Sequence, residues 1–268
     1  MYTMIFALAI APLANAEDSE FEGTAEAGQK FEESETKLSA EIGGAMAAGN
    51  TEFWTVNGLM TGSRKWGRNQ LAGELGANLG NGVVDADADG VLSDRERRAG
   101  RQRTAQKYWT EARYDRFVGV KDSIYVLGGA LVDPFAGYDL RSHEQVGYSR
   151  ILLDTDTKLV GELGIDVAQE NYVDGVDPNS ANIIAARAML GFSHKFSENV
   201  AFSDTIEAYE NVVDPNDLRI LNEVALTSKL SDTFSLKLSH QLTWDNVPVD
   251  GFRKTDHTAL ATLVASIF

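Results

Sequence analysis

The feature that most constrains the fold of this chain is an alternation of apolar and polar side chains, repeated in segments of ten to fourteen residues from Lys37 onward. In residues 234–245, FSLKLSHQLTWD, the even positions are apolar except for His240, and the odd positions are polar. A period of two residues places the two sets on opposite faces of a β-strand. Repeated along the chain, it predicts a sheet whose two faces meet different surroundings.

The connections between these segments come in two kinds. Short polar turns such as residues 154–157 and 197–199 alternate with longer connections such as residues 171–181 and 247–256. This asymmetry is typical of transmembrane barrels, and the aromatic residues cluster towards strand ends as interfacial residues do. A soluble sandwich also alternates, but its strands are usually shorter. We predict an all-β fold, a closed antiparallel transmembrane β-barrel of about twelve strands with both termini in the periplasm.

The first residues, MYTMIFALAIAPLANA, have the pattern of an export signal. An apolar run precedes the small-x-small sequence that ends at Ala16, and this run is too short to span a bilayer as a helix. We predict a signal peptide over residues 1–16, an acidic periplasmic leader over 17–36, and a barrel over 37–268 with an inserted acidic loop at 82–103. An exported chain of this kind belongs in the outer membrane of a Gram-negative bacterium.

The acidic charge of the chain argues against some classes of partner, while its predicted location suggests others. Its formal net charge of −16 argues against binding nucleic acid, and the absence of cysteine excludes disulfides and thiolate sites. The expected partners are outer-membrane lipid and, through a last strand that ends at Phe268, the outer-membrane assembly machinery. The sequence does not indicate an oligomeric state.

Several stretches resemble the salt-induced outer-membrane protein family, a group of largely uncharacterised bacterial barrels. The likeness is carried by GNT at 49–51, FAGYDLR at 135–141, LLDTDTKL at 152–159, FSHKFS at 192–197, LSDTFSLKLS at 230–239 and GFRKTD at 251–256. These are turn and strand signatures, so the resemblance implies a fold and a location and does not imply a reaction. The chain departs from the family at Ser266, where an aromatic residue is usual, and in the inserted loop at 82–103.

Catalysis is not expected. The four histidines are scattered, and no Gly-x-Ser-x-Gly, His-Glu-x-x-His or P-loop motif is present. The leading hypothesis is a small passive pore or envelope barrel. A closed structural or surface-interaction barrel, whose loops bind ions or a partner, is the alternative, and an outer-membrane enzyme comes third.

The polar positions of the strands predict the lining of the barrel. Charged candidates for the inner face are dominated by acidic residues: Glu41, Glu74, Glu111, Arg113, Asp115, Glu162, Asp166, Arg187, Glu207 and Glu223. These side chains either form ion pairs that fill a narrow barrel or line a small aqueous pore. An open pore would prefer cations, because carboxylates lower the entry barrier for positive ions.

Residues 85–96, DADADGVLSDRE, match the twelve-residue calcium loop of EF-hands at each diagnostic position. The expected ligands are the side chains of Asp85, Asp87, Asp89 and Glu96, the backbone carbonyl of Val91, and Ser93 through a water molecule. No helix is expected to lead into this loop and no partner loop exists, so we predict weak Ca²⁺ binding, of order 10⁻⁴–10⁻³ M. A solvated acidic loop without an ion is the alternative.

Overall fold

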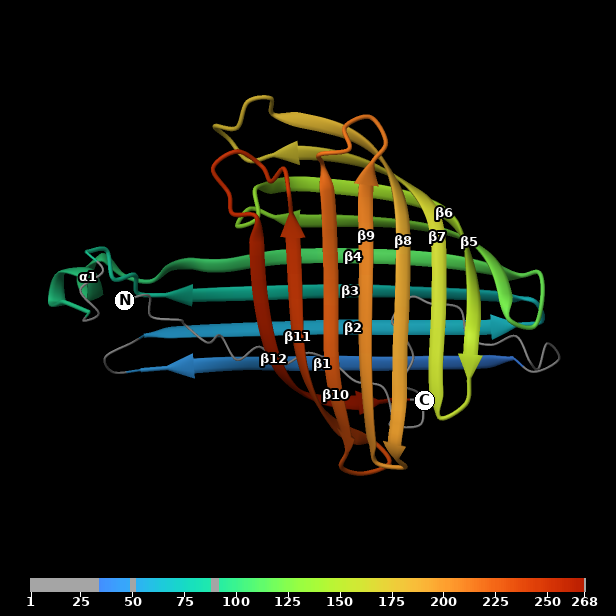
Figure 1. Cartoon of the computed structure of the whole chain (residues 1–268). Helices are drawn as coiled ribbons and strands as arrows, with labels where there is room; N and C mark the ends of the chain where they lie inside the picture. Colours follow the sequence, from blue (N-terminus) through green and yellow to red (C-terminus); the bar gives the residue numbers. More distant parts are fainter. Residues whose placement is uncertain (1–33, 49–51, 88–91, 268) are drawn as a thin grey trace.

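The chain folds into a closed barrel, seen in a computed structural model that describes residues 34–48, 52–87 and 92–267 (Figure 1). Within these residues there are twelve strands and one short helix. They are β1 (Glu35–Ala47), β2 (Phe53–Trp66), β3 (Asn69–Gly82), α1 (Asp94–Ala99), β4 (Gln102–Phe117), β5 (Asp122–Asp133), β6 (Tyr138–Asp154), β7 (Thr157–Tyr172), β8 (Ser180–Ser197), β9 (Val200–Asn211), β10 (Leu218–Lys229), β11 (Phe234–Asp245) and β12 (Thr255–Ser266).

Each strand pairs antiparallel with the next strand in sequence, and β1 pairs with β12 to close the barrel. The predicted closed antiparallel barrel of twelve strands is confirmed. Its connections alternate in length. Turns such as residues 67–68 and 155–156 gather at one end, the tight-turn end, and connections such as residues 83–101 and 246–254 gather at the other, the long-loop end.

The first strand begins at Glu35, two residues before the predicted start of the barrel. The predicted signal peptide, the leader up to residue 33 and Phe268 lie outside the described residues. No helix among the described residues is both long enough and apolar enough to cross a membrane.

The barrel buries polar side chains and exposes apolar ones. Along β7, Glu162 and Asp166 are buried, whereas Leu163 is 66% exposed and Ile165 and Val167 are also exposed. Since neighbouring positions of a strand face opposite sides, the buried set points into the barrel and the exposed apolar set points out. This is the alternation that the sequence predicted, with the polar face inward.

The helix α1 was not expected, although its start is encoded locally. It follows the acidic loop between β3 and β4, and Ser93 and Glu96 form a capping box at its first turn. Arg97 of α1 forms an ion pair with Glu52, which immediately precedes β2. The inserted loop therefore ends in an ordered turn of helix that is tied to the neighbouring connection at the long-loop end.

Candidate functional site

The ten predicted lining residues all lie on the inner face of the barrel, at positions whose neighbours along each strand point outward. Five of them form a continuous group with a tyrosine, which we call the mid-lumen cluster: Arg113, Asp115, Tyr125, Glu162, Arg187 and Glu207. The cluster joins β4, β5, β7, β8 and β9. Glu41 is also buried, Glu74 lies opposite Glu111 in the β3–β4 ladder, and Glu223 lies on β10.

Glu162 is the centre of the mid-lumen cluster. Its Oε1 accepts a hydrogen bond of 2.8 Å from Arg113 Nη2, and its Oε2 accepts one of 2.7 Å from Arg187 Nη1. A third bond, of 3.1 Å, runs from Arg113 Nη1 to Oε2. Each guanidinium has a further carboxylate: Asp115 for Arg113 at 2.8 Å, and Glu207 for Arg187 at 2.9 Å. Charges this deeply buried are tolerated because each has a bonded counter-charge.

Tyr125 of β5 crosses two strands to reach this cluster. Its hydroxyl accepts a hydrogen bond of 2.8 Å from Arg187 Nη1 on β8, and its ring lies 4.0 Å below the Arg113 guanidinium. The ring passes over Gly147 and Gly164, where an added Cβ would lie 2.5 Å and 2.8 Å from Tyr125 atoms. These two glycines on β6 and β7 therefore make room for the tyrosine.

A second group, the mouth cluster, lies nearer the long-loop end and was missed by the sequence analysis. It consists of Arg141, Glu170, Asp217, Arg219 and Asp245. Arg219 of β10 forms ion pairs with Glu170 of β7, with Asp217 and with Asp245, and Arg141 lies 3.2 Å from Glu170. Alternation along β7 does place Glu170 inward, since it shares the parity of Glu162. Nothing in the sequence pairs it with an arginine three strands away.

A histidine lies between the two clusters. His143 Nδ1 is 3.1 Å from Asp166 Oδ1, and its Nε2 is 3.9 Å from Glu111 Oε2. Gln145 contacts the same ring at 3.3 Å and donates to the Tyr209 hydroxyl at 3.3 Å. Asp166, a predicted lining residue, is thereby linked to the rest of the polar interior.

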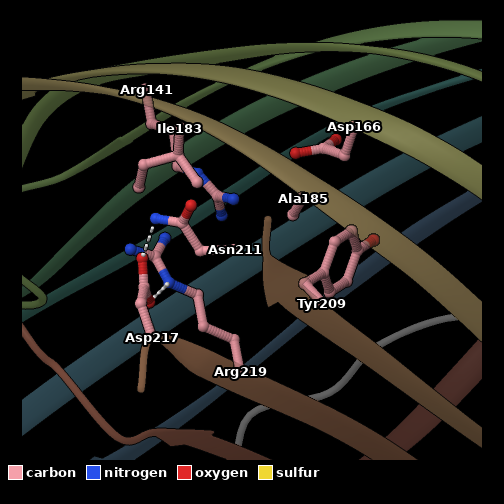
Figure 2. Close-up of a pocket in the computed structure, with 8 residues that line it drawn as sticks. All are labelled: Arg141, Asp166, Ile183, Ala185, Tyr209, Asn211, Asp217 and Arg219. Atoms are coloured by element: carbon pink, nitrogen blue, oxygen red, sulfur yellow. Dashed lines mark hydrogen bonds and ion pairs between the residues drawn. The ribbon is translucent and has the colours of Figure 1, made fainter. Parts of the chain in front are cut away.

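A cavity of about 10 Å³ lies beside the mouth cluster (Figure 2). It is lined by three residues of that cluster and five others: Arg141, Asp217 and Arg219, with Asp166, Ile183, Ala185, Tyr209 and Asn211. A volume of this size holds about one water molecule. The packing around it leaves no room there for an organic ligand.

Other inward carboxylates remain in contact with solvent. The side chains of Glu111, Glu207 and Glu223 are 29%, 24% and 30% exposed. Glu223 is held by Lys237 at 2.8 Å and by Gln241 at 2.8 Å. Ion pairs therefore line the interior along β4–β11, and water reaches the carboxylates of Glu111, Glu207 and Glu223 there.

The inserted loop brings three of its predicted calcium ligands together. One carboxylate oxygen each from Asp85, Asp87 and Glu96 lie within 4.8 Å of one another. Asp89 and Val91 lie outside the described residues. Leu92, at the usual apolar position of such loops, is buried. The spacing of these carboxylates suits a hard cation with oxygen ligands.

Ser93 and Glu96 are more closely coupled than expected. The Ser93 backbone N–H and hydroxyl each donate to Glu96 Oε2 at 2.8 Å, and the Ala86 N–H donates to Glu96 Oε1. These bonds, led by that of the Ser93 backbone, hold the pKa of Glu96 below its ordinary value of 4.5. Glu96 is thus fixed as a carboxylate next to Asp85 and Asp87.

Comparisons with solved structures find other barrels at low sequence identity. The NanC porin aligns with a TM-score of 0.49 and 9% identity over 86% of this chain and 97% of that one. The translocator domain of the autotransporter NalP from Neisseria meningitidis has a TM-score of 0.42 and 11% identity, covering 86% of each chain. Because these scores are below 0.5, the likeness assigns neither a solute nor an activity to this chain.

Sequence comparisons give the family. A search of curated proteins finds no significant match. Residues 40–267 match the family described as protein of unknown function, DUF481. That description does not contain the name of the salt-induced outer-membrane protein family, so that resemblance stays a prediction. The match covers the barrel from its first strand to its last, and the chain belongs to the DUF481 family.

Proposed function

We propose that this protein is an integral outer-membrane β-barrel that acts as a narrow passive pore. One observation carries the proposal: inside a closed barrel with an apolar outer face, the carboxylates of Glu111, Glu207 and Glu223 remain exposed to solvent. A water-accessible polar interior behind a lipid-compatible surface is the arrangement of a barrel pore. The long loops would lie outside the cell and both termini in the periplasm.

The pore is narrow because ion pairs cross its interior. Arg113 of β4 reaches Glu162 of β7, and Arg219 of β10 reaches Glu170 of β7, so each bond spans three strands. Such cross-links limit the permeant species to small ions and solutes. The arginines of the mouth cluster reduce the acidic excess of the lining, but carboxylates still outnumber basic groups there. We therefore expect a modest preference for cations.

Planar-bilayer recording of the refolded barrel tests this function. Small single-channel steps are expected, with a reversal potential in a salt gradient that indicates cation selectivity. Glu223→Gln should reduce the selectivity, because it removes an exposed carboxylate and leaves Lys237 without that partner. Glu144→Gln on the outer face is the matched control and should change nothing. Anion selectivity would refute the assignment of the lining.

A closed structural barrel is the second candidate, favoured by the dense ion pairs of the mouth cluster. Absence of conductance under every salt condition would select it. An enzyme is not proposed. His143 has Asp166 beside it, but Gln145 and Glu111 are its other described contacts, and none of these groups is a serine or threonine nucleophile.

The inserted loop supplies the second part of the proposal, a weak calcium site. It is supported by the EF-hand spacing of residues 85–96, by the convergence of Asp85, Asp87 and Glu96, and by the helix α1 that follows the loop directly. Mutual repulsion of these carboxylates is relieved when a divalent cation binds. The ion would order the loop. Through the ion pair between Arg97 and Glu52 it would also restrict the motion of the connection between β1 and β2.

Calorimetric titration of the folded barrel with CaCl₂ tests the site. We expect a dissociation constant of order 10⁻⁴–10⁻³ M. Asp85→Ala and Glu96→Gln should each abolish the heat. Asp94→Asn, at a position of the loop that supplies no ligand, is the matched control. Heat that survives both ligand substitutions would show that calcium binds elsewhere, and no heat at millimolar calcium would remove the site.

A further inference from the structure

Five lysines gather at the tight-turn end of the barrel. Each lies within three residues of that end of its strand, on β1, β2, β7, β8 and β10. An even number of residues separates each of them from a buried or lining residue of the same strand, such as Glu162 on β7 or Arg187 on β8. Their side chains therefore point into the barrel. We call this group the lysine ring: Lys37, Lys65, Lys158, Lys195 and Lys229.

Four of these lysines form two pairs on opposite sides of the lumen. Lys37 and Lys65 are one diagonal step apart in the β1–β2 ladder, and Lys158 and Lys195 have the same relation in the β7–β8 ladder. Diagonal neighbours on one face of a sheet are about 7–8 Å apart, so the flexible stems of a pair can bring both ammonium groups to one anion. β1 and β7 are six strands apart in the closed barrel, so the two pairs face each other.

Acidic groups at this end are fewer than the lysines. Within the described ranges, the inward carboxylates within three residues of these strand ends are Glu35, Asp115 and Asp154. Asp115 is already bound by Arg113 in the mid-lumen cluster. Glu35 lies 3.8 Å from Lys37 and is 54% exposed, and an exposed ion pair of this kind is weak. The tight-turn end therefore keeps a positive charge, whereas carboxylates outnumber arginines in the mouth cluster.

Two buried hydroxyl groups lie beside the lysine ring. Ser235 of β11 is opposite Lys229 in the β10–β11 ladder, and Thr262 of β12 is opposite Lys237 in the next ladder. Ser235 and Thr262 are 1% and 0% exposed, and neither hydroxyl has a hydrogen-bond partner in the part of the chain that the structure describes. Buried hydroxyls are normally bonded, and each can donate to an anion oxygen directly or through a water molecule. They are a second, independent indication of an anion site.

We propose that the lysine ring binds small anions that carry several phosphate groups. A phosphate offers more charge and more acceptor oxygens than a carboxylate, and an ammonium group binds it as a point charge. A single phosphate reaches one lysine pair, whereas a short chain of phosphates also reaches Lys229 or the opposite pair, so the affinity rises with the number of phosphates. Inside a narrow lumen the bound anion obstructs the path of ions. The site does not depend on conductance, but this obstruction rests on the proposed pore.

Calorimetric titration of the folded barrel with sodium tripolyphosphate tests the site. A neutral detergent and a calcium-free buffer ensure that the heat comes from a free anion, without a lipid headgroup or the inserted loop. Saturable binding is expected at an ionic strength of about 0.01 M, and it should disappear at about 1 M, where salt screens the lysines. Inorganic phosphate should bind more weakly than tripolyphosphate. Equal affinity of the two anions would contradict the role of two lysine pairs.

Substitutions on the two faces of the wall identify the groups that bind. Lys158→Gln/Lys195→Gln should weaken the binding of tripolyphosphate about tenfold or more, because two charged donors are lost, and Lys158→Arg/Lys195→Arg should restore it. The matched control is Arg64→Gln/Arg116→Gln, which removes two positive charges from the outer face at the same end and should leave the affinity unchanged. Equal losses in the glutamine variants of both faces would show a general effect of charge and overturn the site.

The acidic segment at residues 17–33 is the rival source of negative charge for the ring. Deleting it should leave the affinity for tripolyphosphate unchanged. Binding that appears only after the deletion would assign the ring to this segment and overturn the proposal.

Planar-bilayer recording separates the site from the pore. Tripolyphosphate, added to each side in turn, should reduce the current from one side only, and this effect should be lost in Lys158→Gln/Lys195→Gln. A current that the anion does not change would overturn the obstruction. Binding heat that survives the lysine substitutions would overturn the site. Binding heat without conductance in any salt would refute the pore and support the site alone.

Discussion

Neutralising Glu162 should destabilise the barrel more than any other single removal of a lining charge. Glu162→Gln keeps the shape of the side chain but removes its negative charge. In the wild-type protein this carboxylate accepts three hydrogen bonds, of 2.7, 2.8 and 3.1 Å, from Arg113 and Arg187. An amide has one accepting oxygen, so its NH₂ must then face a guanidinium that also donates. Both arginines keep their second carboxylates, Asp115 and Glu207.

The expected loss in the free energy of unfolding follows from the burial of Glu162 and its two arginines. The Glu162 side chain is 0% exposed, and those of its two arginines are 2% and 5% exposed. Removing one partner from a buried ion pair costs about 3–5 kcal/mol, because the remaining charge is left without full compensation. Glu207→Gln is the matched control. That carboxylate also binds Arg187, but it is 24% exposed, so water screens the change and the cost should stay below about 2 kcal/mol.

The assay is urea-induced unfolding of the barrel in phospholipid vesicles, with the free energy of unfolding compared among the wild-type protein and the two variants. Circular dichroism should report an intact β-sheet for both variants before urea is added. Equal losses for Glu162→Gln and Glu207→Gln, or no loss for either, would refute the reasoning. Such a result would mean that water surrounds Glu162 and that the mid-lumen cluster does not constrict the barrel.

Further predictions follow from other parts of the molecule. Leu163→Arg, on the outer face of β7, should cost about 2–4 kcal/mol of unfolding free energy at mid-bilayer, and a smaller cost would place that face away from lipid. Gly147→Ala should cost about 1–3 kcal/mol in the same assay, because its Cβ would lie 2.5 Å from the Tyr125 ring and 2.6 Å from a backbone oxygen. Amino-terminal sequencing of protein from outer-membrane fractions should begin at Glu17, and an intact first methionine would contradict export. The heat of calcium binding should persist as the pH falls to 5 and disappear only at lower pH. The reason is that the lowered pKa of Glu96 keeps its carboxylate ionised until the pH falls through that pKa. Loss of the binding heat between pH 7 and 6 would contradict this.

The sequence alone was enough to predict the barrel and the inward or outward direction of most side chains. A two-residue period decides the face on which each residue lies, and Glu162 and Leu163 were assigned correctly from that period alone. The spacing of Asp85, Asp87 and Glu96 within twelve residues likewise predicted that these carboxylates would meet, because a short loop can bring them together without help from the rest of the fold. The helix after the loop was missed although Ser93 and Glu96 encode its capping box.

Only the tertiary structure decided which residues meet across the barrel. The bonds from Glu162 to Arg113 and Arg187, and from Glu170 to Arg219, join strands that are not neighbours. The pairing of β1 with β12 joins strands that are far apart in sequence, and a Cβ on Gly137 would lie 3.0 Å from Val249 in the connection between β11 and β12. These contacts depend on the tilt and stagger that twelve strands adopt together when the sheet closes. Alternation along one strand carries no information about that stagger, so it predicts the face of a residue and not its partner.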